Sequence, residues 1–190
     1  MAFSSGQLQK LSHKLDRQHV HTRSVDGREL DYIEGWFVIA EANAIFGFGG
    51  WDREMIHFEK LYERTRDEVT SCAYVARVRI AVRAGASRVV REGTGLGSAS
   101  CKNASDAHER AIKAAETDAT KRALATFGNR FGLGLYDKEQ TGVTPRLSNK
   151  SFVLKDGTGI AIATNISGEA FCSGLRQIIQ KLDSREQLER

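Results

Sequence analysis

The sequence predicts an α+β fold in which an antiparallel three-stranded sheet packs on one long helix. Two observations support this prediction. Residues 51–92 hold three stretches that alternate apolar and polar side chains between short turns. Residues 105–129 form an alanine-rich amphipathic pattern with helical spacing. Flanking helices before the sheet, and a C-terminal hairpin plus helix after the long helix, complete the expected fold.

The three expected strands lie at Trp51–Arg64, Cys72–Arg83 and Ser87–Glu92, with a polar hairpin tip at Arg66–Glu68. The first strand should place one set of large side chains on a single face: Ile56, Phe58 and Tyr62. The second strand alternates most cleanly, and its polar face carries three arginines without an acid among them: Arg77, Arg79 and Arg83. We therefore expect one face of the sheet to be buried and one basic face to be open to water.

The long helix is expected to begin near Ser105–Asp106, which suit an N-cap and a first turn, and to end near Gly128–Asn129. One side carries small or apolar residues that let a sheet approach closely: Ala111, Ile112, Ala115, Ala119 and Ala123. Another side gathers Arg110, Lys113, Thr117 and Lys121, and Arg122 lies at the edge of the buried side. Spacing alone leaves two interpretations open, a solvated charged face or a basic surface that binds a ligand.

Before the sheet we expect a helix at Ser4–Leu15, a short strand at Leu30–Ile33 and a second helix at Trp36–Phe46. The residues with helical spacing in that second helix are Trp36, Ile39, Ala40, Asn43 and Ala44. The polar and basic stretch Asp16–Arg28 is expected to be a loop. It contains histidines, but no Cys or His follows at the spacing of a zinc site, so we expect no metal.

Composition limits the class of protein. The chain has 190 residues, of which 41% are hydrophobic and 27% charged, as in a soluble globular protein of one domain or one domain plus an appendage. No apolar run approaches about 18 residues, and residues 1–10 lack an export signal. Three scattered cysteines suggest reduced thiols. We expect no membrane contact and no secretion, but a cytoplasmic, nucleoid-associated protein in a prokaryote, or a nuclear or organellar one in a eukaryote.

The charge is unevenly distributed along the chain. The formal net charge is +4, but residues 24–70 hold 5 Lys or Arg against 11 Asp or Glu. Residues 77–130 reverse this balance, with 11 basic residues against 5 acidic ones. An acidic band beside a basic band indicates either a groove for a polyanion or complementary surfaces between subunits.

The glycine-rich stretch Gly93–Lys102 resembles a nucleotide-binding loop but fails the tests for one. Lys102 follows Cys101 and precedes Asn103, so the Gly-Lys-Ser/Thr of a phosphate-binding loop is missing, and so is the glycine spacing of a dinucleotide site. We expect a flexible connector in which Lys102 can meet a phosphate. No nucleophile elbow, zinc motif or converging carboxylates appear either. The sequence therefore predicts no enzyme, no cofactor and no metal.

Pro145, the only proline, divides the expected domains into residues 1–144 and a C-terminal extension at 145–190. In the extension, Ser151–Leu154 and Gly159–Thr164 flank a turn and predict a hairpin. A helix at Gly168–Glu189 should follow. Its apolar stripe would pack on its own domain or on a neighbouring subunit: Phe171, Leu175, Ile178, Ile179 and Leu182.

Three motifs occur in an order that resembles a known family. They are Tyr32–Trp36 (YIEGW), Asn43–Trp51 (NAIFGFGGW) and the run Thr117–Asn129, which contains Lys-Arg-Ala-Leu. With the Ala/Val/Arg strand, they resemble the N-terminal annealing domain of the Rad-fifty-two family of single-strand annealing recombination proteins, over about Leu8–Glu139. The resemblance implies a β-β-β-α core, assembly side by side into a ring of about ten subunits, and single-stranded DNA held in a groove without nucleotide hydrolysis.

By motif position, the resemblance implies a set of DNA-binding residues: Arg23, Tyr32, Lys121 and Arg122, with Lys102 and Lys113 as weaker counterparts. A further basic residue of the family pattern is replaced here by Ala125. The expected function is ATP-independent binding of single-stranded DNA and annealing of complementary strands in homologous recombination and double-strand break repair. Double-stranded DNA and a recombinase or single-strand-binding protein are further candidate partners. A basic groove fits this function because it grips phosphates and leaves base edges free to pair.

Two other classes of function remain open at this point. One is a protein-interaction module whose charged bands mate with a partner and never touch nucleic acid. The other is an enzyme, a metal-dependent nuclease or an NTPase, which the missing motifs make the weaker alternative. Binding to oligonucleotides distinguishes the first alternative, and metal- or ATP-dependent turnover distinguishes the second.

Overall fold

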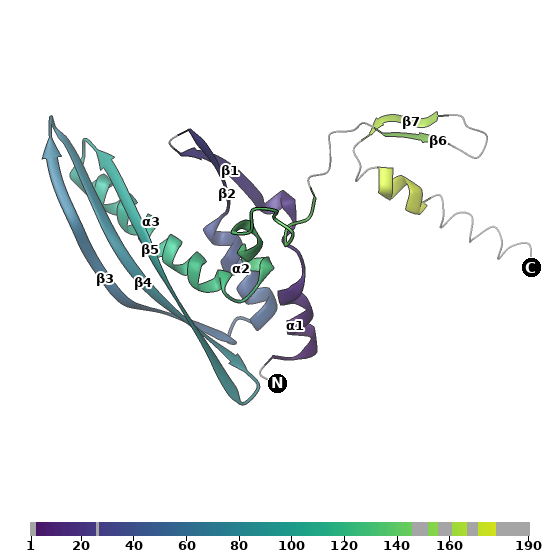
Figure 1. Cartoon of the computed structure of the whole chain (residues 1–190), viewed down its shortest axis with the longest axis horizontal. Coiled ribbons are helices and arrows are strands. Elements are labelled where there is room, and N and C mark those ends of the chain that lie inside the picture. The colour runs from purple at the N-terminus through teal and green to yellow at the C-terminus, as the bar shows by residue number, and fades with distance from the viewer. Residues whose placement is uncertain (1–2, 26, 146–151, 156–160, 167–170, 178–190) are drawn as a thin grey trace, which may run out of the picture. The chain divides into compact units, whose positions relative to one another are not determined.

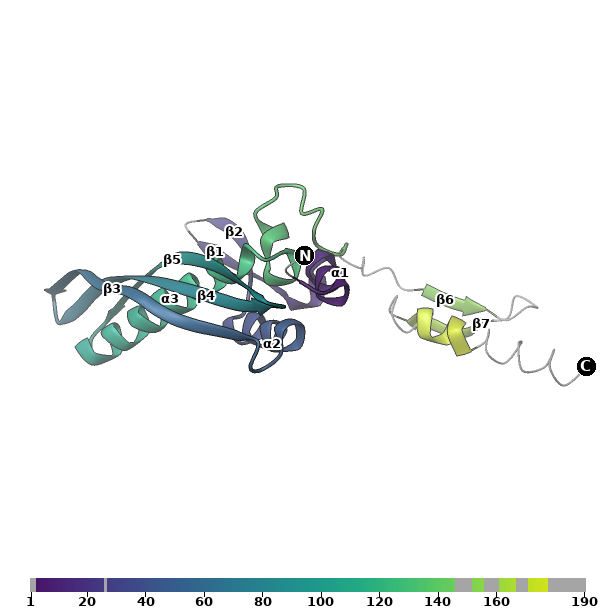
Figure 2. The same ribbon diagram turned by 90° about the horizontal axis from the view of Figure 1, so that it is seen from below.

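The computed structural model describes residues 3–25, 27–145, 152–155, 161–166 and 171–177 of the chain. The chain divides into two compact units, Met1–Thr144 and Pro145–Arg190. The first unit is built on a three-stranded antiparallel sheet of β3 (Trp51–Arg66), β4 (Val69–Ala84) and β5 (Ser87–Cys101). The long helix α3 (Ala104–Ala125) runs along this sheet, as Figures 1 and 2 show from two sides. The prediction of an α+β fold is confirmed.

The central strand β4 has the alternation that its sequence predicts. Its apolar residues lie on the face against α3 and are all buried: Cys72, Tyr74, Ala76, Val78, Ile80 and Val82. Its arginines lie on the opposite, open face. The expectation of an uninterrupted basic face is wrong, however, because neighbouring strands supply acids. Arg79 pairs with Glu54 of β3 and Glu92 of β5, and Arg83 pairs with Asp52.

The third strand is longer than expected. Ser87–Glu92 was the predicted strand, with a flexible connector after it, but β5 continues through Gly93, Gly95 and Gly97 to Cys101. These three glycines share the face that meets α3. A Cβ atom on Gly95 would lie 2.2 Å from the backbone nitrogen of Ala119, and one on Gly97 would lie 2.0 Å from the carbonyl oxygen of Ala111. The glycines are therefore required by a close approach to the helix and do not mark a loop.

The glycines of β5 match a periodic row of small residues on α3. Two strand residues advance about 6.8 Å, and four helix residues advance about 6.0 Å. Successive glycines of β5 therefore lie against successive turns of α3, which runs antiparallel to the strand. The row on the helix is fully buried: Ala107, Ala111, Ala115, Ala119 and Ala123. The sequence predicted the last four of these, whereas Ile112, also predicted for this side, is only partly buried. Strand and helix approach nearly backbone to backbone.

Strand β3 departs from simple alternation. Register shifts occur between Met55 and His57 and again between Lys60 and Tyr62. Phe58 therefore pairs with Ala76 on the helix side, where it stacks on Tyr74 with ring centroids 5.2 Å apart. Tyr62 pairs with Ala73 and points to the open face. The expected single face for these aromatics is wrong because each bulge inserts one residue and reverses the side-chain direction.

Helix α3 begins one residue before the expected position and ends earlier than expected. Its N-cap is Asn103, whose side-chain oxygen accepts a hydrogen bond of 2.9 Å from the Ser105 amide. At the other end Thr126 is the C-cap, and Gly128 follows with φ of +149°. The short 3₁₀ turns η2 (Asn129–Phe131) and η3 (Leu133–Leu135) then fold back beneath the helix end. This turn buries Phe131 in the core.

The N-terminal region supplies two helices and a hairpin. Helix α1 (Ser5–Ser12) carries a capping box, and the 3₁₀ turn η1 (Arg17–His19) follows it. The predicted loop is wrong from residue 20 on, because β1 (Val20–Val25) pairs with the predicted strand, β2 (Arg28–Ile33). Nearly all residues of β1 are exposed, so its sequence lacks the apolar alternation that announces a strand.

Helix α2 (Gly35–Phe46) forms as predicted but buries a different face. The buried residues are Phe37, Val38, Ala42, Ile45 and Phe46. The residues whose helical spacing predicted this helix lie mostly in solvent, with Trp36 65% exposed and Ile39 39% exposed. Both faces of this short helix are apolar, so periodicity alone does not determine which one packs inward. The first unit is closed where Leu15 bridges Val143 in a parallel pair.

The second unit contains β6 (Phe152–Lys155) and β7 (Ala161–Ile166), which pair antiparallel and confirm the predicted hairpin. Residues 171–177 are helical, as expected for the start of the C-terminal helix. Three residues of its predicted stripe lie outside the described residues: Ile178, Ile179 and Leu182. Among the helices that the structure describes, none is both long and apolar enough to cross a bilayer.

The contact between β5 and α3 predicts a severe effect of a single methyl group. We expect Gly95→Ala to destabilise the protein by about 2 kcal/mol or more, because an inflexible backbone surrounds the added Cβ atom. Gly6→Ala is the control, since a Cβ atom there meets nothing within 4 Å and Gly6 lies in a helix. Urea unfolding measures both variants. Equal unfolding midpoints for the two would show that the strand and the helix are not in close contact.

Candidate nucleic-acid interface

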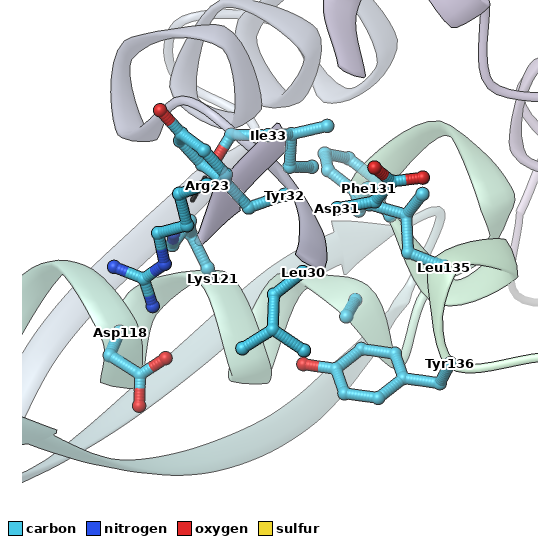
Figure 3. Close-up of a pocket in the computed structure, with 12 residues that line it drawn as sticks. Arg23, Leu30, Asp31, Tyr32, Ile33, Asp118, Lys121, Phe131, Leu135 and Tyr136 are labelled. Atoms are coloured by element: carbon cyan, nitrogen blue, oxygen red, sulfur yellow. Dashed lines mark hydrogen bonds between the residues drawn. The ribbon is translucent and has the colours of Figure 1, made fainter. Parts of the chain in front are cut away.

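A pocket of about 250 Å³ lies between the β1–β2 hairpin and the C-terminal half of α3. Figure 3 shows its lining, with Arg23 and Tyr32 from the hairpin, Asp118 and Lys121 from the helix, and Tyr136 from the segment after η3. The pocket forms because α3 is held against β5 on one side, which leaves another side of its last turns facing the hairpin. Residues far apart in the sequence thus meet at one place.

Tyr32 is the aromatic centre of this pocket. The Arg23 guanidinium carbon lies 5.5 Å from the centroid of its ring, and the Lys121 ammonium lies 5.7 Å from it. Arg23 pairs with Leu30 in the hairpin register, so Arg23, Leu30 and Tyr32 share one face. A half-buried tyrosine with two cations near its ring is a cation–π arrangement that holds positive charge beside an aromatic surface.

Lys121 is partly buried at the base of the pocket. Its ammonium donates a hydrogen bond of 3.3 Å to the carbonyl oxygen of Ile33, at the end of β2. Burial lowers the pKa of Lys121, and the nearby Asp118 carboxylate opposes that shift while Arg23 adds to it. The ammonium is therefore fixed in direction and incompletely hydrated, so an anion that reaches it meets a cation that has already lost part of its water.

Arg122 lies next to the pocket on the same helix turn. Its Nε donates a hydrogen bond of 2.8 Å to Asp118, four residues earlier, and its side chain is 52% exposed. This hydrogen bond and the carboxylate charge raise the pKa of Arg122. A half-exposed guanidinium is suited to bidentate contact with a phosphate.

Apart from Asp31, which pairs with Arg17, the rest of the pocket lining is mainly apolar. Its wall is formed mainly by carbon atoms of the hairpin, the helix end and the following turns: Leu30, Ile33, Ala125, Phe131, Leu135 and Tyr136. Ala125 stands where the family resemblance expects a basic residue, and its small side chain leaves room in the pocket. A cationic side beside an apolar one is suited to a ligand that carries both an anionic and an apolar part, as the sugar–phosphate backbone of a nucleic acid does.

Three of the six sequence-predicted residues do not line this pocket: Arg122, which lies beside it, and Lys113 and Lys102, which lie farther away. Lys113 is exposed and pairs with Glu109 on the outer side of α3. It lies about 12 Å along the helix from Lys121. Lys102 is exposed in the connection from β5 to α3, at the far end of the helix. The structure therefore brings together Arg23, Tyr32 and Lys121, with Arg122 beside them, and leaves Lys102 and Lys113 outside this group.

Sequence reasoning missed Asp118 and Tyr136, which both take part in this site. Asp118 precedes Arg122 by four residues, a spacing that predicts an ion pair on a helix. That signal was present in the sequence. No pattern in the sequence pointed to Tyr136, because it reaches the pocket only through the reversal of the chain at Gly128 and Gly132.

Within the described ranges, no three His, Cys, Asp or Glu side chains gather as metal ligands would.

Comparison with known proteins identifies the family. The sequence profile described as Rad52/22 family double-strand break repair protein matches residues 4–169. The chain belongs to the Rad52/22 family. The matched region contains every residue of the pocket and extends past the first compact unit into the second.

Individual relatives agree with this assignment. The DNA repair and recombination protein RAD52 of Candida glabrata is 40% identical over 135 residues, which cover 69% of this chain and 26% of that protein. The protein of the same name in Saccharomyces cerevisiae is 39% identical over 134 residues, which cover 68% of this chain and 27% of that protein. The DNA repair and recombination protein rad22 of Schizosaccharomyces pombe is 37% identical over 132 residues, which cover 67% of this chain and 28% of that protein. The chain thus spans little more than a quarter of the length of these relatives.

The environment of Lys121 predicts an unusual titration. Burial should bring its pKa below the ordinary lysine value of 10.5, whereas the hydrogen bond from Lys60 to Glu63 should bring the pKa of Lys60 above that value. Titration followed by the NMR signals of the two lysine side chains measures both midpoints in one sample. Lys121 should lose its proton first as the pH rises. A Lys121 midpoint at or above that of Lys60 would contradict the buried position at the base of the pocket.

Proposed function

We propose that this protein binds single-stranded DNA and anneals complementary strands, without ATP, in homologous recombination and double-strand break repair. The observation that carries the proposal is the pair of cations, Arg23 and Lys121, near the ring of Tyr32 in one pocket. Arg122 beside it supplies a third cation. The names of the relatives, which are DNA repair and recombination proteins, support the same function.

The chemistry of the pocket suits a backbone ligand. Phosphates attract the three cations regardless of base sequence, and release of counterions on binding drives the association. Tyr32 offers a ring to a sugar or a base, a contact worth about 1–3 kcal/mol when a base stacks. Annealing requires that the protein neutralise phosphate repulsion between two strands while their base edges stay free. Contacts made only to the backbone meet both requirements.

This proposal assigns residues 1–144 as the annealing domain and residues 145–190 as an extension. The protein would act where chromosomal DNA is kept, in a nucleoid or a nucleus. It would do so as a binding protein and not as an enzyme, since pairing of complementary strands is downhill and needs no bond to be broken. In this role the protein would also bind double-stranded DNA, and it would contact a recombinase or a single-strand-binding protein.

We expect the purified protein to speed the pairing of two labelled complementary oligonucleotides in EDTA without nucleotide. The double substitution Lys121→Ala/Arg122→Ala should slow annealing and weaken single-strand binding for every sequence alike. Each lost phosphate contact should also make the slope of log affinity against log salt shallower by about 0.7. Fluorescence quenching follows annealing, and anisotropy at several salt concentrations follows binding.

The matched control is Arg77→Ala/Arg83→Ala, which removes the same charge from the open face of the sheet. It should anneal like the unchanged protein. If both double variants lose binding equally, net charge rather than the pocket explains the affinity. If annealing proceeds only with added ATP or metal, the proposed function is wrong.

We further propose that copies of the chain assemble into a closed ring of about ten subunits. The acidic band of residues 24–70 and the basic band of residues 77–130 give one copy complementary surfaces to offer the next. The exposed Trp36 and Ile39 on α2 add an apolar surface that a neighbour can cover. A ring would join many weak pockets into one long and tight site.

Light scattering coupled to size exclusion tests the assembly. At micromolar concentration we expect a single species of about ten times the mass of the chain. Trp36→Ser should shift this species toward smaller assemblies, because it removes exposed apolar area. A monomer or simple dimer in the unchanged protein would rule out the ring.

A further inference from the structure

Two carboxylates line the pocket of the proposed DNA site, Asp31 and Asp118. Asp31 pairs with Arg17, which is not one of the three cations, whereas Asp118 lies among them. Asp118 accepts the hydrogen bond of Arg122 at 2.8 Å, and its charge favours the protonated form of Lys121. It also lines the same pocket as Arg23, and Figure 3 shows the two side chains on the same side of that pocket. A site built only to attract phosphate would carry no acid at this position, so the carboxylate needs a physical explanation.

The ion pair between Asp118 and Arg122 is weak and easily exchanged. Both side chains are partly exposed, with 33% and 52% of their surface in solvent. Exposed ion pairs of this kind on a helix contribute little to stability. A phosphate that reaches Arg122 forms charge-assisted hydrogen bonds of greater strength and carries a full charge of its own. The geometry of the pair therefore permits a phosphate to replace the carboxylate.

We propose that Asp118 is an internal competitor for the DNA backbone, which takes the place of a phosphate while the site is empty. In the free protein the carboxylate balances Lys121 and Arg122, which would otherwise repel each other and Arg23. On binding, a phosphate takes over Arg122 and the carboxylate turns to solvent. This inference rests on the proposed function and adds a residue that limits the affinity of the site.

A limit on affinity has a use in annealing. Two strands held on the protein must shift along each other until complementary bases meet, and a backbone gripped too tightly cannot move. When a phosphate leaves, the Asp118 carboxylate pairs with Arg122 again. This pair offsets part of the free-energy cost of breaking the contact between Arg122 and the phosphate. Asp118 thereby favours exchange of phosphates at the site over long residence.

Asp118→Asn tests the proposal, because it removes the charge and keeps the size. We expect about three- to tenfold tighter binding of a fluorescein-labelled oligothymidylate, since a like charge near the phosphate is gone. The slope of log affinity against log salt should become steeper by up to about 0.7, because in the unchanged protein the released carboxylate takes up a cation. Annealing of complementary strands should slow despite the tighter binding.

Two further variants make the result specific. Glu116→Gln removes the same charge about 160° around the helix and should leave affinity and slope unchanged. Asp118→Glu keeps a carboxylate in reach of Arg122 and should restore the original slope. Weaker binding by Asp118→Asn would overturn the proposal and make Asp118 a residue that orients Arg122. Equal effects of Asp118→Asn and Glu116→Gln would overturn it as well. If the unchanged protein shows no affinity for the oligonucleotide, the proposed function fails together with this inference.

Discussion

The close approach of β5 to α3 is the contact on which the rest of the structure depends. Gly93, Gly95 and Gly97 leave no room for a Cβ atom, and the helix meets them with alanines at every fourth position. This contact fixes both the height of α3 above the sheet and its rotation about its own axis. Rotation matters most, because it decides which side of the last turns faces the β1–β2 hairpin and which side covers the edge of β5.

The electrostatics of the site follow from that rotation. Lys121 is turned toward the hairpin, where it loses water and donates to the Ile33 carbonyl oxygen. Asp118 and Arg122 come to the adjacent side, where they remain partly in solvent. On the other face of the sheet, each arginine of β4 finds an acid on a neighbouring strand. Three cations from distant parts of the sequence thus meet at the pocket, with Asp118 among them.

The sequence predicted those features that depend on one element at a time. The alternation of β4 and the alanine row of α3 were both readable, because each is a periodic pattern within one segment. The course of β5 was not, since glycine marks a turn unless the partner surface that excludes a side chain is known. The bulges of β3 and the exposed hairpin strand β1 likewise leave no periodic signal. Lys121 and Arg122 entered the candidate site through family motifs, whereas the proposed role of Asp118 required the geometry of the pocket.

Hydrogen–deuterium exchange of the protein with and without oligothymidylate tests the central claim, that the backbone of DNA binds between the hairpin and the end of α3. We expect slower exchange of amides in residues 20–33 and 128–136 when DNA is bound. Residues 54–64 of β3, at the far edge of the sheet, should exchange at the same rate in both states. Protection confined to β3 and its hairpin, with an unchanged β1–β2 hairpin, would show that DNA binds elsewhere on the protein.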